Sequence, residues 1–353
     1  MKSKTIKAVL GKKFKEWVET IENPKVREAV MSNTIITGGA IVSLLQNEIP
    51  NDYDVYFKDK ATTKLVAKYY CRQFNLENKG KETKIKTPLT AYVIDGEEIE
   101  SWKNGKANLS AVTNGLYAQN FPYKIYDNEK VVRVSHMITN ITADRIKVII
   151  PSDGIAESEK TEKPTLDDVF NSFDDLSEMD SDILEKGHEA EKLKKYHPVF
   201  MSTNAITLSD KIQLVIRFYG EPEVLHENYD FEHCKCYWTS WNKNLVLPAR
   251  SLEAIINKEL FYTGSKYPLC SVIRTRKFIQ RGWRINAGQY LKMCFQISEL
   301  DLTDIDVLED QLVGVDSLYF MAVVDSLRLA KAKGDKTFSF DSSYLNTIID
   351  KIF

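Results

Sequence analysis

Residues 34–57 of the chain read TIITGGAIVSLLQNEIPNDYDVYF, and this stretch decides the fold. Its first four residues, Thr34–Thr37, are all β-branched, which favours a short strand. The glycine pair that follows predicts a turn, and the apolar segment Ala40–Leu45 predicts a helix. Strand character resumes at Asp54–Phe57, so the expected order is strand, turn, helix, strand.

Two acidic residues mark the start of the second strand. Asp52 and Asp54 are two positions apart, so in an extended chain their carboxylates point to the same face. Holding like charges that close is costly unless a cation lies between them. Hard divalent ions prefer oxygen ligands, so we expect Mg²⁺ (or Mn²⁺) to be bound by Asp52 and Asp54.

The glycine pair fits the same chemistry. Gly38 and Gly39 let the backbone approach a phosphate, and the N-terminus of the following helix supplies amide donors and a favourable dipole. A glycine pair alone is usually a plain turn, and an Asp-x-Asp pair alone is usually an exposed loop. Here both occur in order, with Asp52 thirteen residues after Gly39, and the combination is much more specific.

This arrangement resembles the signature of nucleotidyltransferases of the DNA polymerase beta superfamily, in which a Gly-Gly or Gly-Ser turn precedes a strand with paired carboxylates. A second likeness runs from Tyr229 to Ile297, which is similar to the corresponding part of bacterial-type CCA-adding enzymes and poly(A) polymerases. Its motifs are Tyr229-Asp230-Phe231, the run Val272–Phe278, and Arg281-Gly282-Trp283. The similar segments cover roughly a quarter of the chain. The chain most resembles a divergent phage-encoded relative of these enzymes.

The resemblance implies a fold and a set of site residues. The fold is α+β, with a nucleotidyltransferase (polymerase beta-like) mixed-sheet domain followed by an all-helical C-terminal domain. A third catalytic carboxylate and metal ligand is expected at Asp230, on a strand predicted over Tyr229–Trp238, with Glu232 on the same strand face as the alternative. Nucleotide-binding residues are expected at Gly38, Gly39, Ser43, Arg274 and Lys277.

The remaining patterns give the domain order. Helical spacing and a break at Pro24 predict helices near the N-terminus, and two β-type runs, Ala205–Leu208 and Lys211–Phe218, predict a hairpin. The region 88–150 is expected to be mostly strand. We therefore expect N-terminal helices (1–32), a first part of the core (33–150), an acidic mobile insertion (151–200), a second part of the core (201–245) and a helical C-terminal domain (246–353).

Charge is distributed unevenly along the chain. Residues 152–192 carry fourteen acidic residues and four lysines, so a formal net charge of −2 hides a mildly basic remainder. Between Lys266 and Lys292 there are seven Lys or Arg and no Asp or Glu. Within this run, four basic residues at helical spacing predict a stripe that holds triphosphate or a nucleic-acid backbone, unless it is a solvated helix face: Arg274, Lys277, Arg281 and Arg284. Arg281 and Arg284 are expected to contact nucleic acid.

Other residues carry weaker signals. His233-Cys234-Lys235-Cys236 lacks a second Cys/His pair at the spacing of a structural zinc site, so we interpret both cysteines as buried strand residues. Trp238, Trp241 and Trp283 could stack bases, although core packing is the commoner role of tryptophan. The number of cysteines, five, is odd, and we find no signal peptide, which favours a cytoplasmic protein. No apolar run is long enough to favour insertion in a membrane.

These observations favour an enzyme. The expected reaction is the transfer of a nucleoside monophosphate from an NTP to an acceptor hydroxyl, with Asp52, Asp54 and Asp230 as catalytic residues and an RNA 3′ end as the acceptor. A protein hydroxyl or a second nucleotide stays open as the acceptor, and the sequence leaves the oligomeric state open. The competing hypothesis is a catalytically silent member of the same fold that binds nucleic acid or is a structural phage protein.

Overall fold

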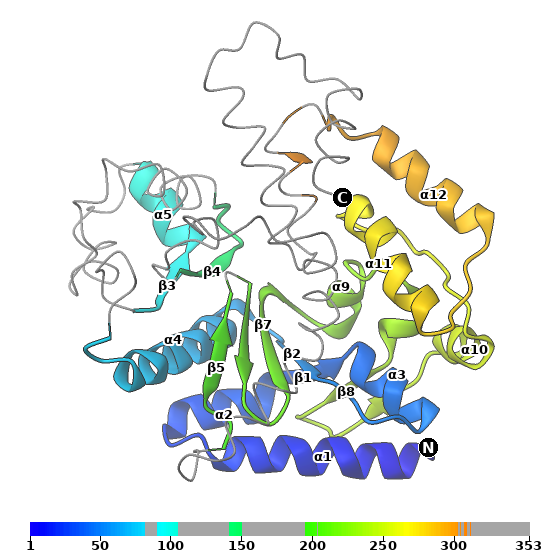
Figure 1. Ribbon diagram of the computed structural model, residues 1–353. Coiled ribbons are helices and arrows are strands. Elements are labelled where there is room, and N and C mark those ends of the chain that lie inside the picture. The colour runs from blue at the N-terminus through cyan, green and yellow to red at the C-terminus, as the bar shows by residue number, and fades with distance from the viewer. Residues whose placement is uncertain are drawn as a thin grey trace, which may run out of the picture. The chain divides into compact units, whose positions relative to one another are not determined.

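The structure is a computed structural model of the chain, and it describes residues 1–81, 90–104, 141–149, 195–202, 204–302, 304, 307, 308 and 311 (Figure 1). The chain divides into two compact units. Unit 1 comprises Met1–Gly154, Lys194–His226 and Cys234–Leu252, and unit 2 comprises Ile155–Leu193, Glu227–His233 and Glu253–Phe353.

Unit 1 contains a sheet with helices packed beside it. Its helices are α1 (Ser3–Glu19), α2 (Pro24–Asn33), α3 (Gly39–Gln46), α4 (Lys60–Glu77), α5 (Gly96–Lys103) and α9 (Pro222–His226). Its strands are β1 (Thr34–Thr37), β2 (Tyr53–Phe57), β3 (Tyr92–Asp95), β4 (Ile146–Ile149), β5 (Pro198–Met201), β6 (Ala205–Leu208), β7 (Ile212–Tyr219), β8 (Tyr237–Thr239) and β9 (Leu245–Val246). Later elements are a 3₁₀ turn η3 (Glu232–Lys235) and helices α10 (Ala249–Asn257), α11 (Pro268–Gln280) and α12 (Ala287–Ser298).

The main sheet is mixed. Its strand order is β5-β6-β7-β2-β1-β8-β9, and all neighbours pair antiparallel except β2 and β7, which are parallel. Helices follow the last strand along the chain. The α+β class expected from the sequence is therefore confirmed.

Several local signals act as predicted. Asn23 caps α2 by accepting hydrogen bonds from the amides of the next turn, and Pro24 occupies its first position, which explains the break after α1. The hairpin of β6 and β7 is confirmed; its turn is made by Asp210 and Lys211, both with positive φ. The strand and helix around the glycine pair are also confirmed.

The sheet buries one face completely. Five apolar residues lie in register across five strands and are each at most 2% exposed: Ile206, Leu214, Val55, Ile36 and Trp238. Phe14 of α1 contacts Trp238 at a ring distance of 5.2 Å, so α1 covers this face. The indole of Trp17 donates a 2.7 Å hydrogen bond to Tyr70, which ties α1 to α4. This row forms the core that fixes the strand register.

The region 88–150 contains more than the predicted strands. The strands β3 and β4 formed as expected and pair as a small antiparallel sheet, but a helix, α5, follows β3 directly. Asp95 starts this helix, because its carboxylate accepts a 3.0 Å hydrogen bond from the amide of Glu97. The expectation of mostly strand did not include this helix. Residues 105–140 lie outside the described part, as do residues 151–194 of the acidic insertion predicted to be mobile.

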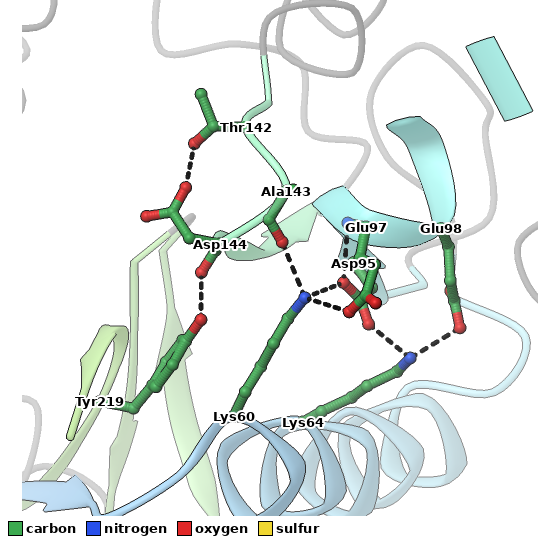
Figure 2. Close-up of polar contacts among 9 residues, drawn as sticks. All are labelled: Lys60, Lys64, Asp95, Glu97, Glu98, Thr142, Ala143, Asp144 and Tyr219. Atoms are coloured by element: carbon green, nitrogen blue, oxygen red, sulfur yellow. Dashed lines mark hydrogen bonds and ion pairs between the residues drawn. The ribbon is translucent and has the colours of Figure 1, made fainter. Parts of the chain in front are cut away.

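Two lysines of α4 anchor this small sheet to the rest of unit 1 (Figure 2). Lys60 contacts the Asp95 carboxylate at 2.7 Å and the carbonyl oxygen of Ala143 at 2.7 Å. Lys64 contacts the other oxygen of Asp95 at 2.6 Å and Glu98 at 2.6 Å. Asp95 is only 5% exposed, so one buried carboxylate holds two ammonium groups of the neighbouring helix. We call Lys60, Lys64 and Asp95 the anchor cluster.

Gly96 is required where α5 passes Thr142. A Cβ added to Gly96 would lie 1.8 Å from the carbonyl oxygen of Thr142, a backbone atom that cannot move away easily. We expect Gly96→Ala to lower the free energy of unfolding by about 2–3 kcal/mol because the loop must shift. Gly11→Ala is the matched control: a Cβ there meets nothing within 4 Å, and Ala in helix α1 should add about 0.5–1 kcal/mol. Chemical denaturation of both variants measures this, and equal effects would contradict the expected clash.

Within the described residues, none of the helices is long and apolar enough to cross a membrane.

Candidate functional site

The turn after β1 is built as the sequence predicts. Gly38 has φ 83° and ψ −147°, a conformation that only glycine adopts without strain. Its amide donates a 3.2 Å hydrogen bond to the carbonyl oxygen of Cys234. Helix α3 then begins at Gly39, which is exposed and has nothing within 4 Å of the place where a Cβ would be. A side chain at Gly39 would therefore extend into open space. Ser43 lies one turn further on and is half-buried.

The carboxylate pair lies beside this turn. Asp54 of β2 is paired in register with Thr37, the last residue of β1, and is half-buried. Asp52 precedes β2 and is exposed. Between them, the amide of Tyr53 donates a 2.8 Å hydrogen bond to the carbonyl oxygen of Lys211, which fixes the start of the strand. The structure thus brings Asp54, Gly38 and Gly39 together at one end of the β1–β2 pair.

Asp54 belongs to a line of polar residues across the sheet. In register with one another are Thr207 on β6, Gln213 on β7, Asp54 on β2, Thr37 on β1 and Tyr237 on β8. Each is next in sequence to a residue of the buried apolar row, so this polar row lies on the opposite face of the sheet. All except Thr37 are half-buried. The sequence shows each residue but not their alignment, which depends on pairing between distant strands.

His226 is a site residue that the sequence analysis missed. It ends α9, and its Nε2 lies 3.0 Å from the Thr37 hydroxyl, 189 residues away in sequence. Its ring lies 5.4 Å from that of Tyr237. Burial lowers the pKa of His226 to about 4, and the positive charge of Lys235 adds to this shift. No local signal marks His226, since only the tertiary structure places it beside Thr37.

The aromatic cluster of unit 2 holds a second buried histidine. His233 is 1% exposed and lies 4.3 Å from the ring of Trp283 and 4.8 Å from that of Phe278. Its Nδ1 has no hydrogen-bond partner in the part of the chain that the structure describes. Burial lowers the pKa of His233 to about 4, although the negative charge of Asp230 opposes the shift.

These two histidines predict an acid-sensitive fold. Both folded pKa values lie below 6.5, the ordinary value, so the unfolded chain binds more protons and stability falls as the pH drops from about 6.5 towards 4. Between pH 7 and pH 5 we expect a loss of roughly 2 kcal/mol of unfolding free energy from each histidine. Urea denaturation at both pH values measures the total, and His233→Phe should remove about half of the pH dependence. An unfolding free energy that is equal at pH 7 and pH 5 would contradict this account.

Asp230 lies in a different setting from the one predicted. Tyr229–Trp238 is not a strand: it contains a bend at Asp230, the 3₁₀ turn η3, and strand only from Tyr237. The prediction of one strand was wrong because this segment pairs with residues 261–263; for example, the amide of Glu232 donates to the carbonyl oxygen of Phe261. Asp230 is 6% exposed and paired with Arg274 at 2.7 Å, and it belongs to unit 2. Its role as third carboxylate, and the choice between Asp230 and Glu232, stay predictions.

The predicted basic stripe is not continuous. Helix α11 ends at Gln280, and the chain turns at Gly282, which has φ 79°, so Arg281 and Arg284 do not continue the helix face. The prediction of four basic residues on one helix was wrong for these two. Arg284 instead reaches back to the carbonyl oxygen of Asn257 at 3.3 Å, and Arg274 contacts Asp230. Lys277 is exposed on α11.

The cysteines and tryptophans take mostly structural places. Cys236 is buried, whereas Cys234 is half-buried and lies in η3 rather than in a strand. Trp238 and Trp283 are at most 6% exposed, as expected for core residues, while Trp241 is 37% exposed with the Lys58 ammonium 4.9 Å from its ring centre.

The donor set at the carboxylate pair fits a hard divalent ion. Asp52 is exposed and Asp54 half-buried, so neither is shut off from solvent. Mg²⁺ is commonly held by one or two carboxylates together with waters and substrate phosphates, rather than by a closed protein cage. Among the described residues no group of three or more His, Cys, Asp or Glu side chains gathers as a metal site. Asp52 and Asp54 therefore suit an ion that arrives with a nucleotide.

Comparison with known proteins gives one match. A protein-family model described as Gabija anti-defense 2 family protein matches residues 8–258, more than two thirds of the chain. The match includes the glycine pair, Asp52, Asp54, His226 and Asp230, and it ends before Arg274. No curated protein and no solved structure matches the chain.

Proposed function

Because the chain belongs to the Gabija anti-defense 2 family, a family of phage proteins that counter host defence, we propose that it acts as a nucleotidyltransferase in the host cytoplasm. In this proposal it transfers a nucleoside monophosphate from an NTP to an acceptor hydroxyl, with Mg²⁺ or Mn²⁺. Nucleotidyl transfer of this kind would either modify a component of the defence or consume or mark a molecule that the defence needs.

One observation carries the proposal. The register of β1 with β2 sets Asp54 directly opposite Thr37, one residue before the Gly38 turn and the N-terminus of α3. A helix N-terminus suits phosphate, and a carboxylate pair beside it would suit the cation that accompanies a triphosphate. This register supports a nucleotide site in unit 1 that combines the turn with Asp54.

Each residue has a distinct role in the proposed reaction. Asp52 and Asp54 hold the divalent ion, which would activate the attacking hydroxyl and stabilise charge on the leaving pyrophosphate. The amides of the first α3 turn, beginning at Gly39, bind phosphate oxygens, whereas the Gly38 amide is already bonded to Cys234. The main contribution of the protein is then to position the triphosphate beside Asp54.

The acceptor would be bound by groups other than Asp52 and Asp54. We propose an RNA 3′ end as the acceptor, on the strength of the resemblance to CCA-adding enzymes and poly(A) polymerases. Arg274 and Lys277 would contact nucleotide, and Arg281 and Arg284 would contact the acceptor backbone. Asp230 would orient the acceptor hydroxyl, and a larger loss of turnover in Asp230→Asn than in Glu232→Gln would support that role.

A second candidate is a catalytically silent protein that binds nucleotide or nucleic acid. The observation that favours it is the 2.7 Å ion pair of Asp230 with Arg274, which occupies the predicted third carboxylate. Such a protein would bind NTP or RNA but form no product.

The test is direct. The purified chain is incubated with each α-labelled NTP, with Mg²⁺ or Mn²⁺, and with pooled RNA, DNA or protein acceptors. We expect label on RNA with one preferred NTP, and none without the metal. Binding of NTP, seen as metal-dependent thermal stabilisation, without label on any acceptor would favour the silent protein instead. Neither binding nor label would reject both candidates.

A further inference from the structure

The hydroxyl of Thr37 connects three segments of unit 1. It lies 2.9 Å from the carbonyl oxygen of Cys236 and 3.0 Å from Nε2 of His226. A hydroxyl has one hydrogen to donate, and a carbonyl oxygen can only accept. The hydroxyl also lies 3.4 Å from the carbonyl oxygen of Cys234. The tautomer that satisfies the two shorter contacts gives the Thr37 hydrogen to Cys236 and carries a hydrogen on Nε2 of His226, which it donates to Thr37.

The next residue is tied to the same segment. The amide of Gly38 donates to the carbonyl oxygen of Cys234, two residues before Cys236. Thr37 and Gly38 are thus each attached to the Cys234–Cys236 strip, one by side chain and one by backbone. Since Thr37 is in register with Asp54, a shift of the strip would change the distance between the glycine turn and the carboxylate.

The imidazole is itself held in place. Its ring is tilted by 59° against that of Tyr237, the residue of β8 that is in register with Thr37. The Tyr237 hydroxyl donates to Glu223 at 3.4 Å, and Glu223 lies on α9 with His226. Helix α9 is therefore fastened to the polar row by two contacts, His226 with Thr37 and Glu223 with Tyr237.

We infer that His226 is a positioning residue: by donating from Nε2 to Thr37, it holds the Gly38-Gly39 turn at a fixed distance from Asp54. This inference rests on the proposed function for its catalytic consequence, because the turn is where the triphosphate would bind. The contacts that carry the inference are those of His226 with Thr37 and Tyr237. Its inferred contribution is to the geometry of the turn.

The test compares two replacements of similar size. His226→Gln keeps an N–H donor that reaches Thr37, whereas His226→Phe keeps a ring against Tyr237 but has no donor. His197→Phe, a half-buried histidine at the start of β5, controls for the general effect of losing an imidazole. The first measurement is amide hydrogen exchange in the peptide that covers residues 34–46. The second is kcat and KM for the NTP.

In His226→Phe we expect at least roughly tenfold faster exchange at the turn, while His226→Gln and His197→Phe stay within about threefold of the parent. The rate of nucleotidyl transfer should change in parallel, with kcat/KM lower by about 10- to 100-fold in the Phe variant and restored in the Gln variant. Unchanged exchange in His226→Phe overturns the inference whatever the activity. Faster exchange with unchanged kcat/KM also overturns it, because the turn would then not limit transfer. If the parent transfers nothing, the proposed function fails, and the exchange result alone decides whether His226 holds the turn.

Discussion

Replacing Asp54 by asparagine is expected to lower the rate of nucleotidyl transfer by at least ~10³-fold, because one carboxylate that holds the divalent ion loses its charge. Asn is nearly isosteric with Asp, and Asp54 is half-buried in the polar row, so the fold should remain intact. Asp52→Asn should have an effect of the same order. The measurement is kcat with the preferred NTP, together with the thermal unfolding midpoint.

A matched control lies in the loop that also contains Asp52. Glu48 is exposed between α3 and β2, so Glu48→Gln removes one negative charge a few residues from Asp52 without touching the turn. Its kcat should stay within about twofold of the parent, since an exposed charge is strongly screened. The same pair of variants tests the biological role: in hosts with and without the Gabija defence, the Asp54 variant should lose the anti-defence effect and the Glu48 variant should keep it. Full activity of purified Asp54→Asn would reject the assignment of the site.

Asp95→Ala is expected to cause the largest loss of stability, about 3–5 kcal/mol of unfolding free energy, because it leaves the two lysines of the anchor cluster without their shared buried carboxylate. Burial alone would raise the pKa of Asp95, but hydrogen bonds from Lys60 and Lys64 outweigh it and lower the pKa. Burial likewise would lower the pKa of each lysine, and the hydrogen bonds to Asp95 raise it.

The signs of these shifts select the conditions. A lowered carboxylate pKa gives stability that is present above about pH 4 and is lost on acidification, whereas a raised lysine pKa gives stability that is lost above about pH 10. Both contributions are complete at pH 7, where denaturant unfolding should be compared. Glu97→Gln serves as the control, since Glu97 also contacts Lys60 but its side chain is 72% exposed, and it should cost less than about 1 kcal/mol. Equal losses in the two variants would show that the burial of Asp95 does not matter.

The sequence alone determined the local elements on which the site depends. Each of these elements is specified by a few neighbouring residues: four β-branched residues, a glycine pair, an apolar run, and a strand that begins with acidic residues at alternate positions. The corresponding elements β1, the Gly38 turn, α3 and β2 all formed as expected. The caps at Asn23 and Pro24 and the β6–β7 hairpin are equally local. The same locality predicted Asp52 and Asp54 on one face of an extended segment, because alternation along a strand requires no information from elsewhere. In the structure Asp54 lies in β2 and Asp52 directly precedes it.

The tertiary structure decided everything that depends on which distant segment becomes the partner. Tyr229–Trp238 has the composition of a strand, yet it bends and pairs with residues 261–263, since hydrogen-bond partners outside the segment satisfy its backbone. Arg281 leaves the helix face because the chain turns at Gly282. His226 reaches Thr37 across 189 residues, and the polar row exists only through the register of five strands. Side-chain periodicity fixes the face on which a residue lies, but only the packed core fixes what that residue meets there.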